Sequence, residues 1–156
     1  MNAISEVGMD PLTMLDVSPP EFVTIAREAG FDSVSLRVVA STPGEEPWPM
    51  SIGSPMLEET VRRLDDTGNG MLAVEVFRIG PGTRPGDYKD AFEAGARLGA
   101  RYVTVNSDDP DIERATETFA ALTAEAKNYG LRTLIEPIIY TQVSNLDEAI
   151  HVAEHS

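Results

Sequence analysis

The sequence predicts an α/β fold of the (β/α)8 TIM-barrel type, incomplete, with about five strand–helix units. The main observation is a repeat, in which amphipathic segments end in glycine and an apolar run follows within a few residues. The glycines stand at positions 30, 68 or 70, 99 and 130. Glycine supplies the left-handed turn that ends a helix, and strand–helix alternation at this spacing indicates a parallel sheet with right-handed connections.

The repeat assigns the elements in order. An opening strand is expected near "LTMLDV", residues 12–17, and Ser18 followed by two prolines marks the start of the first helix. Four helix–strand pairs follow, with helices at 22–30, 57–70, 88–100 and 115–130 and strands at 31–39, 71–79, 101–107 and 131–137. Asn145 begins a fifth helix, and the chain is expected to stop inside or just after it.

Side-chain alternation in these strands favours a barrel wall. One face carries Val34, Leu36, Val38, Val74, Val76, Val103 and Val105, and the other carries Ser33, Ser35, Arg37, Ala73, Glu75, Phe77, Thr104 and Asn106. A doubly wound sheet is covered by helices on both faces and should be apolar on both. That alternative, a complete five-stranded doubly wound parallel sheet, is favoured only by length, since a full barrel needs about 250 residues. We expect residues 1–156 to form a single domain, the N-terminal portion of a barrel.

The formal net charge of −14 limits the possible partners. It repels nucleic-acid phosphates and anionic membranes, so a small-molecule ligand is the expected partner. The N-terminus has neither the basic start nor the apolar run of a signal peptide, and no stretch has the roughly 20 apolar residues of a membrane span. Because the chain also has no cysteine, we expect a cytoplasmic protein.

The stretch "TLIEPIIYTQV", residues 133–143, places one acid in an apolar strand. An ionised carboxylate held away from water is costly unless something compensates it. Pro137 cannot donate to a sheet ladder, so the strand is expected to end there. Glu136 is therefore either a solvated acid at a strand end, paired with an arginine such as Arg132, or a ligand for a cation.

Three stretches resemble the xylose-isomerase-like TIM-barrel superfamily, which includes sugar-phosphate isomerases and epimerases: "PPEFVTIAREAGFDSVSLRV", "AFEAGARLGARYVTVNSDD" and "LRTLIEPIIYTQVSNLDEAI". The resemblance covers nearly the whole chain but only five of the family's eight units. It implies that Glu136 is a ligand of a divalent metal (Mn²⁺, Mg²⁺, Co²⁺ or Zn²⁺) whose other ligands come from strands six to eight. This chain alone is then expected to bind metal weakly or not at all, and to be inactive. Some family epimerases carry a second glutamate after "EP", whereas this sequence has "IIYTQV" there, which weighs against that particular chemistry.

Further candidates lie near the carboxyl ends of the predicted strands, where barrel active sites are built. Glu75 is interpreted as catalytic, and Arg37 and Asn106 as ligands of substrate hydroxyls or phosphate; the alternative is an internal Glu75–Arg37 pair. Trp48, in the proline-rich loop 40–55, covers a sugar face or packs on the barrel rim. Arg78 has the opposite parity unless its strand has already ended, and is a weaker candidate.

Three other segments are interpreted as structural. "GPGTRPGDY", residues 80–88, is a turn-rich connection rather than a phosphate cradle, and "SDDPDIE", residues 107–113, is a helix entry. "HVAEH", residues 151–155, matches a zinc-peptidase pattern, but no third ligand follows it, so a solvated helix face is the expectation.

These features favour part of a metal-dependent sugar or sugar-phosphate isomerase or epimerase. By resemblance, the ion chelates adjacent carbonyl and hydroxyl oxygens of a carbohydrate while a carboxylate removes a proton. The alternatives are a non-catalytic small-molecule-binding domain, or a metal-dependent lyase or hydrolase of the same superfamily. An incomplete barrel exposes the edges of its first and last strands, so homo-oligomers or association through these edges are expected.

Overall fold

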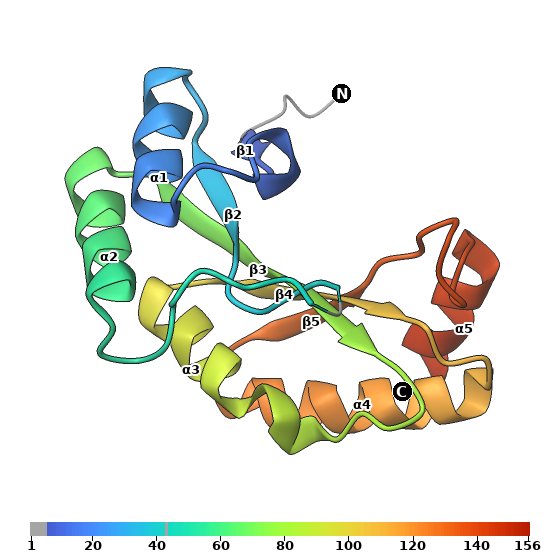
Figure 1. Cartoon of the computed structure of the whole chain (residues 1–156). Helices are drawn as coiled ribbons and strands as arrows, with labels where there is room; N and C mark the ends of the chain where they lie inside the picture. Colours follow the sequence, from blue (N-terminus) through green and yellow to red (C-terminus); the bar gives the residue numbers. More distant parts are fainter. Residues whose placement is uncertain (1–5, 43) are drawn as a thin grey trace.

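The protein is a curved parallel sheet in which strand order follows sequence order (Figure 1). The computed structural model describes residues 6–42 and 44–156. Its strands are β1 (Gly8–Met9), β2 (Ser33–Arg37), β3 (Gly70–Ile79), β4 (Tyr102–Ser107) and β5 (Arg132–Ile135). Each pairs in parallel with the next, in the order β1-β2-β3-β4-β5. A doubly wound sheet reverses its strand order at a switch point, so this alternative is wrong and the incomplete TIM barrel is confirmed.

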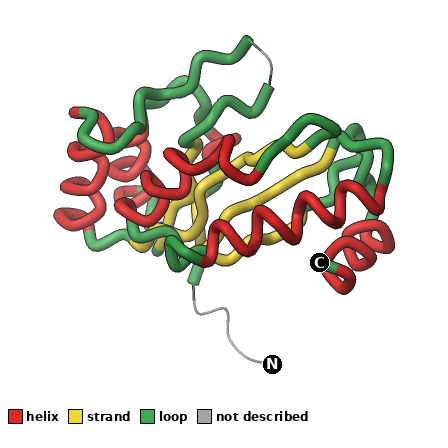
Figure 2. Tube along the Cα trace, turned by 90° about the horizontal axis from the view of Figure 1, so that it is seen from below, coloured by secondary structure: helices red, strands yellow, loops and turns green. Residues whose placement is uncertain are grey.

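In the described part of the chain, five α-helices connect and follow the strands along the outer side of the sheet (Figures 1 and 2). They are α1 (Pro19–Glu28), α2 (Pro55–Thr67), α3 (Lys89–Leu98), α4 (Ile112–Lys127) and α5 (Leu146–His155), with 3-10 turns η1 (Pro11–Thr13) and η2 (Pro85–Tyr88). Helix α1 packs on α2, α2 on α3, and α4 on α5. Right-handed crossovers between successive strands place every connecting helix on the same face.

The predicted helix ends are confirmed by the backbone. Gly30, Gly68, Gly99 and Gly130 all have left-handed φ angles, between 71° and 89°. Gly70 instead opens β3. At the other end of the helices, Ser54, Asp111 and Asn145 accept backbone hydrogen bonds as N-caps of α2, α4 and α5.

The opening strand differs from its prediction. Residues 12–17 do not form a strand, and β1 is the shorter segment Gly8–Met9. Asp10 ends it by accepting a 2.8 Å hydrogen bond from the Leu12 backbone amide, and Pro11 at the first turn position favours η1. The apolar pattern of residues 12–17 therefore belongs to a turn, with Leu12 and Leu15 exposed.

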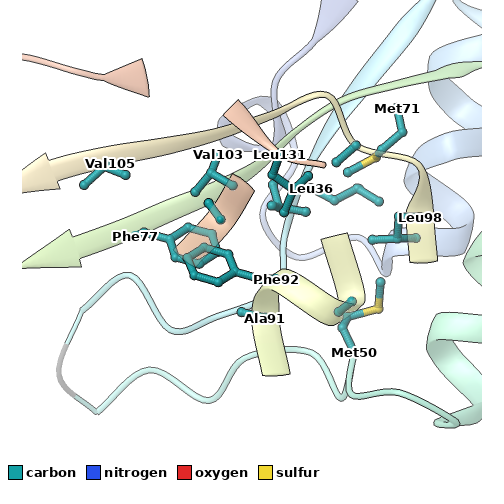
Figure 3. Packing of buried hydrophobic residues seen from close by; sticks show 14 of the residues in the cluster. Leu36, Met50, Met71, Phe77, Ala91, Phe92, Leu98, Val103, Val105 and Leu131 are labelled. Carbon is teal, nitrogen blue, oxygen red and sulfur yellow. The ribbon is translucent and has the colours of Figure 1, made fainter. Parts of the chain in front are cut away.

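The core lies between the sheet and the helices, as Figure 3 shows for part of the cluster. The Phe77 ring of β3 stacks on Phe92 of α3, with ring centroids 5.4 Å apart, and also contacts Tyr88. Gly95 gives α3 its close approach to the sheet, since a Cβ there would lie 3.0 Å from a Val74 methyl group. The aromatic stack therefore anchors α3 to the middle of the sheet.

The alternation of side chains between the two faces of the sheet is interrupted partway along strand β3. The β3–β4 register shifts between Val74 and Phe77. Val74 meets α3, Phe77 is fully buried against α3, and Val76 lines the cavity on the opposite, concave side. The predicted parity, with Val76 facing the helices and Phe77 facing the lumen, is therefore wrong beyond Glu75. Within residues 6–42 and 44–156, no helix has the length and apolar character to cross a membrane.

We expect Phe77→Ala to lower the free energy of unfolding by about 3–5 kcal/mol, because it removes a fully buried ring from this stack. Ile139→Ala serves as the control, since Ile139 is 90% exposed and its loss should cost within about 0.5 kcal/mol. Chemical denaturation followed by circular dichroism measures both. Equal small effects would contradict the proposed role of the stack.

Candidate functional site

A cavity of about 1000 Å³ lies at the carboxyl ends of the strands, on the concave side of the sheet. Four segments form its wall: η1 and the residues after it, the end of β2 with loop residues 39–42 and 45–48, the ends of β3 and β4, and residues 136–140. Four of the five predicted site residues line it, namely Arg37, Trp48, Asn106 and Glu136. Ligands of parallel α/β proteins bind at this end of the strands.

Glu136 follows directly after β5, where its backbone amide donates to the Val105 carbonyl at 2.8 Å. Pro137 then ends the ladder, as predicted. The residue is exposed overall, yet partial burial of its carboxyl, and then the charge of Asp10, raise its pKa. No ion pair joins Glu136 to an arginine within the described residues, and Arg132 lies instead over the Tyr102 ring. The carboxylate is therefore available to a ligand.

Glu75 lies beneath the cavity rather than in its wall. The residue is 6% exposed, and the Thr104 hydroxyl lies 3.4 Å from its carboxylate. Burial, the carboxylate of Asp10 and the charge of Glu136 raise the pKa of Glu75 to about 8. Glu75 is therefore largely protonated at neutral pH, and the alternative of a Glu75–Arg37 pair is not what forms.

Asp10 is the member of this acid group that the sequence reasoning missed. It follows β1 as Glu136 follows β5, and in both places the acid precedes a proline. Its charge is a cause of the raised pKa of Glu75 and of Glu136. The shared acid–proline ending of the first and fifth strands is the signal that would have found it.

Arg37 is held by the loop that follows β2. Its Nη1 donates to Glu45 Oε1 at 3.2 Å. Glu45 Oε2 in turn accepts from the backbone amide and hydroxyl of both Ser41 and Thr42. The Ser41 hydroxyl is the main cause that lowers the pKa of Glu45, so this carboxylate stays ionised and fully hydrogen-bonded.

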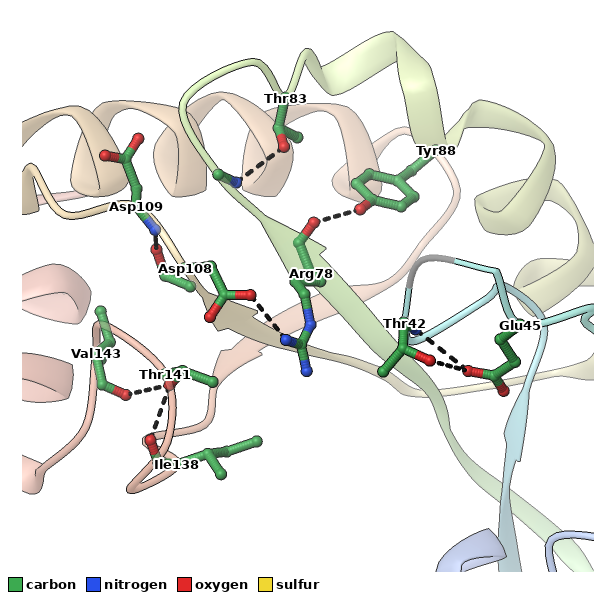
Figure 4. A network of polar contacts seen from close by, with 12 residues as sticks. Thr42, Glu45, Arg78, Thr83, Tyr88, Asp108, Asp109, Ile138, Thr141 and Val143 are labelled. Atoms are coloured by element: carbon green, nitrogen blue, oxygen red, sulfur yellow. Dashed lines mark hydrogen bonds and ion pairs between the residues drawn. The ribbon is translucent and has the colours of Figure 1, made fainter.

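Arg78, the weaker candidate by parity, also lines the cavity because of the register shift in β3. Its Nη1 donates to Asp108 Oδ2 at 2.7 Å (Figure 4). The Tyr88 hydroxyl donates to the Arg78 carbonyl at 2.5 Å and fixes this end of the strand. Asn106 is paired in register with Arg78 on β4 and is 1% exposed. Neither its amide nitrogen nor its amide oxygen has a hydrogen-bond partner within the described residues.

The loop between β2 and α2 is attached at both ends. Glu45 fixes its first part to Arg37, and Met50 is buried in the core next to the Thr60 hydroxyl. Trp48, half-buried between these points, faces the cavity. The position of Trp48 is compatible with both predicted roles, namely covering a sugar face and packing on the barrel rim.

The segments interpreted as structural do not contribute to the cavity. Residues 80–88 form a turn, closed by Gly80 donating to the Thr83 hydroxyl, and continue into η2. Asp111 caps α4, and Asp109 pairs with Arg114. On α5, His151 contacts Glu113 at 3.2 Å, and His155 Nδ1 contacts the His151 carbonyl. In the described part of the chain, no three His, Cys, Asp or Glu side chains gather to hold a metal ion.

Comparison with solved structures finds the same fold in xylose isomerase-like TIM barrels. No family model matches the sequence, and no curated protein matches it either. A xylose isomerase domain containing protein from Salmonella typhimurium LT2 matches 99% of this chain with a TM-score of 0.70 at 17% identity. The IolI protein with a bound zinc atom matches 96% with a TM-score of 0.75 at 14% identity. An L-ribulose 3-epimerase matches 97% with a TM-score of 0.72 at 14% identity.

At these identities the likeness shows the fold. The chain spans 59%, 58% and 57% of these three solved chains, so it corresponds to the N-terminal part of the barrel that they form. The predicted resemblance to xylose isomerase-like barrels is confirmed at the level of fold.

We expect the free energy of unfolding to fall as the pH rises from about 4.5 to about 8. The folded protein keeps the Glu75 proton up to its raised pKa of about 8, whereas the unfolded carboxyl loses it near 4.5, so the folded state binds more protons in this window. Glu136 contributes with the same sign. Glu75→Gln should flatten the profile between pH 5 and 8.

Urea denaturation at several pH values measures this effect. Glu117→Gln is the matched control, because it makes the same chemical change on the exposed face of α4. A Glu75→Gln profile as steep as that of the unsubstituted protein would show that Glu75 is ionised when folded.

Proposed function

We propose that this chain forms the N-terminal five strand–helix units of a metal-dependent sugar or sugar-phosphate isomerase or epimerase. The observation that carries the proposal is Glu136, a carboxylate at the end of β5 that faces the cavity without an arginine partner among the described residues. The negative charge of its neighbour Asp10 makes a cation at this point favourable.

Carbohydrate as the substrate class is supported by the neighbours. Besides the L-ribulose 3-epimerase, they include a D-psicose 3-epimerase studied in the presence of D-fructose and a D-allulose 3-epimerase from Methylomonas sp. in complex with D-allulose. Their TM-scores of 0.71 and 0.72 come with 11% to 14% identity, so their activities come to this chain only as a proposal. The cytoplasm is the proposed compartment, because the chain has no cysteine.

The Glu136 carboxylate supplies one of the several oxygen ligands that a hard divalent ion needs. Carboxylate oxygens suit Mg²⁺ and Mn²⁺, and Zn²⁺ also accepts them, with Glu136 as the proposed ligand. When bound, such an ion polarises the carbonyl and hydroxyl oxygens of a sugar. The described residues hold no three-ligand group, and we propose that the remaining ligands come from the strand–helix units that complete the barrel. The 156-residue chain should therefore bind the ion weakly.

The chain's own residues have distinct proposed roles. Glu75, protonated at neutral pH, holds a proton that it can exchange with the acids beside it. Arg37 and Asn106 orient substrate oxygens, and Trp48 covers an apolar sugar face. Both Glu136 and Glu75 are proposed as catalytic, with Glu75 acting from below the cavity wall.

The test extends the chain after Ser156 with the last three strand–helix units of the L-ribulose 3-epimerase that superposes on it. We expect the extended protein to bind Mn²⁺ and to isomerise or epimerise a sugar or sugar phosphate, and Glu136→Gln to weaken Mn²⁺ binding by about 10- to 100-fold and to abolish turnover. Isothermal titration and a chromatographic sugar assay measure the two effects.

Glu113→Gln, an acid on α4 outside the cavity, is the control and should change neither quantity. A cooperatively folded extended chain whose metal affinity and turnover are unaffected by Glu136→Gln would refute the assignment. Metal-independent sugar binding would favour the non-catalytic binding domain instead.

A further inference from the structure

Two arginines form the least exposed charged groups of the cavity wall. The side chains of Arg37 and Arg78 are 17% and 26% exposed. The acids that also line the cavity are Asp16, Glu45, Glu46 and Glu136. All of these except Glu45 are exposed, so water screens their charge more effectively than it screens the arginines.

Each arginine uses Nη1 for an acid of the protein and leaves Nε without a partner in the part of the chain that the structure describes. Nη1 of Arg37 donates to Glu45 and Nη1 of Arg78 donates to Asp108. The Nε of both arginines is buried and has no hydrogen-bond partner within the described residues. The Nε–Nη2 edge of a guanidinium is a two-donor fork that matches two oxygens of a carboxylate or phosphate.

Asn106 provides an independent observation. It is 1% exposed, lines the same cavity and lies in register with Arg78, and both polar atoms of its side chain are unpartnered in the described structure. An unpaired buried amide is unfavourable, and hydrogen bonds to a ligand would remove this cost. Arg37, Arg78 and Asn106 therefore all line one cavity, and each has buried polar atoms without a hydrogen-bond partner in the described structure.

The acids paired with the two arginines, Glu45 and Asp108, cannot neutralise the arginine charges further. Glu45 already accepts hydrogen bonds from Ser41 and Thr42 as well as from Arg37. Asp108 accepts from Arg78 and is itself partly exposed. Beyond these two ion pairs, the arginines retain Nε donors without a partner among the described residues, which an anionic group of a ligand would satisfy.

We propose that the ligand of this cavity carries an anionic oxygen group, a carboxylate or a phosphate, bound by Arg37 and Arg78 with Asn106 hydrogen-bonded beside it. The sugar part of this ligand rests on the proposed function. The inference narrows the substrate class to sugar acids and sugar phosphates. Because Nε is buried in both arginines, a small side-chain rotation accompanies binding.

Titration calorimetry of the 156-residue chain at low salt tests the proposal with four probes: D-fructose, D-gluconate, D-fructose 6-phosphate and inorganic phosphate. We expect at least one of the two anionic sugars to bind about tenfold or more tightly than D-fructose, with affinity falling as salt rises. The stronger of the two identifies the anionic group as carboxylate or phosphate, and inorganic phosphate isolates the contribution of that group.

Arg78→Lys and Arg37→Lys keep the charge and remove the fork, and each should weaken the anionic sugar by about tenfold while leaving D-fructose unchanged. Asn106→Ala should weaken it too. Arg27→Ala, at the exposed end of α1, is the control and should have no effect. Circular dichroism confirms that each variant is folded.

The proposal is overturned if D-fructose binds as tightly as both anionic sugars, if neither binds at about 10 mM, or if the lysine variants bind like the unsubstituted chain. These outcomes are separate from those for the proposed function. Anion binding through the arginines without metal dependence in the extended chain would refute only the proposed function, and metal-dependent turnover of a neutral sugar alone would refute only this inference.

Discussion

The handedness of the strand connections is the constraint on which the rest of the structure depends. Each parallel strand pairs with the next one in sequence, and because parallel crossovers are right-handed as a rule, all connecting helices lie on one face. That face takes the apolar side chains, including the Phe77–Phe92 stack. The concave face is left to polar groups, and the carboxyl ends of all five strands reach the same rim.

The concave face carries charges of both signs. Three acids perturb one another: Asp10 directly after β1, Glu75 within β3 and Glu136 directly after β5. Arg78 lies three residues beyond Glu75 on the same strand, and Arg37 reaches outward to the loop after β2. A ligand entering from the rim thus meets guanidinium groups before it meets the carboxyl that keeps its proton. This order suits a substrate that is negative at one end and reacts at the other.

The sequence could predict the repeat, the parallel sheet, the glycine-ended helices and the position of Glu136, because these depend on local turn chemistry and side-chain period. It could not predict β1, since two residues carry no period and Asp10 with Pro11 ends the strand early. It also could not place Arg78, because strict alternation fails at the register shift after Val74. Contacts of Arg37 with Glu45 rather than Glu75 depend on how the loop folds back, which neither period nor spacing encodes.

The sequential strand order also determines how the sheet can assemble. Paired residues are close in the chain: Met9 lies beside Val34, Val74 beside Val103 and Val103 beside Thr133. Within residues 6–42 and 44–156, each strand pairs with the strand before it in the sequence, so each new unit can dock on the one before it as the chain emerges from the ribosome. Each added unit pairs with a strand that is already present, and it extends the concave face that carries the arginines and the acids.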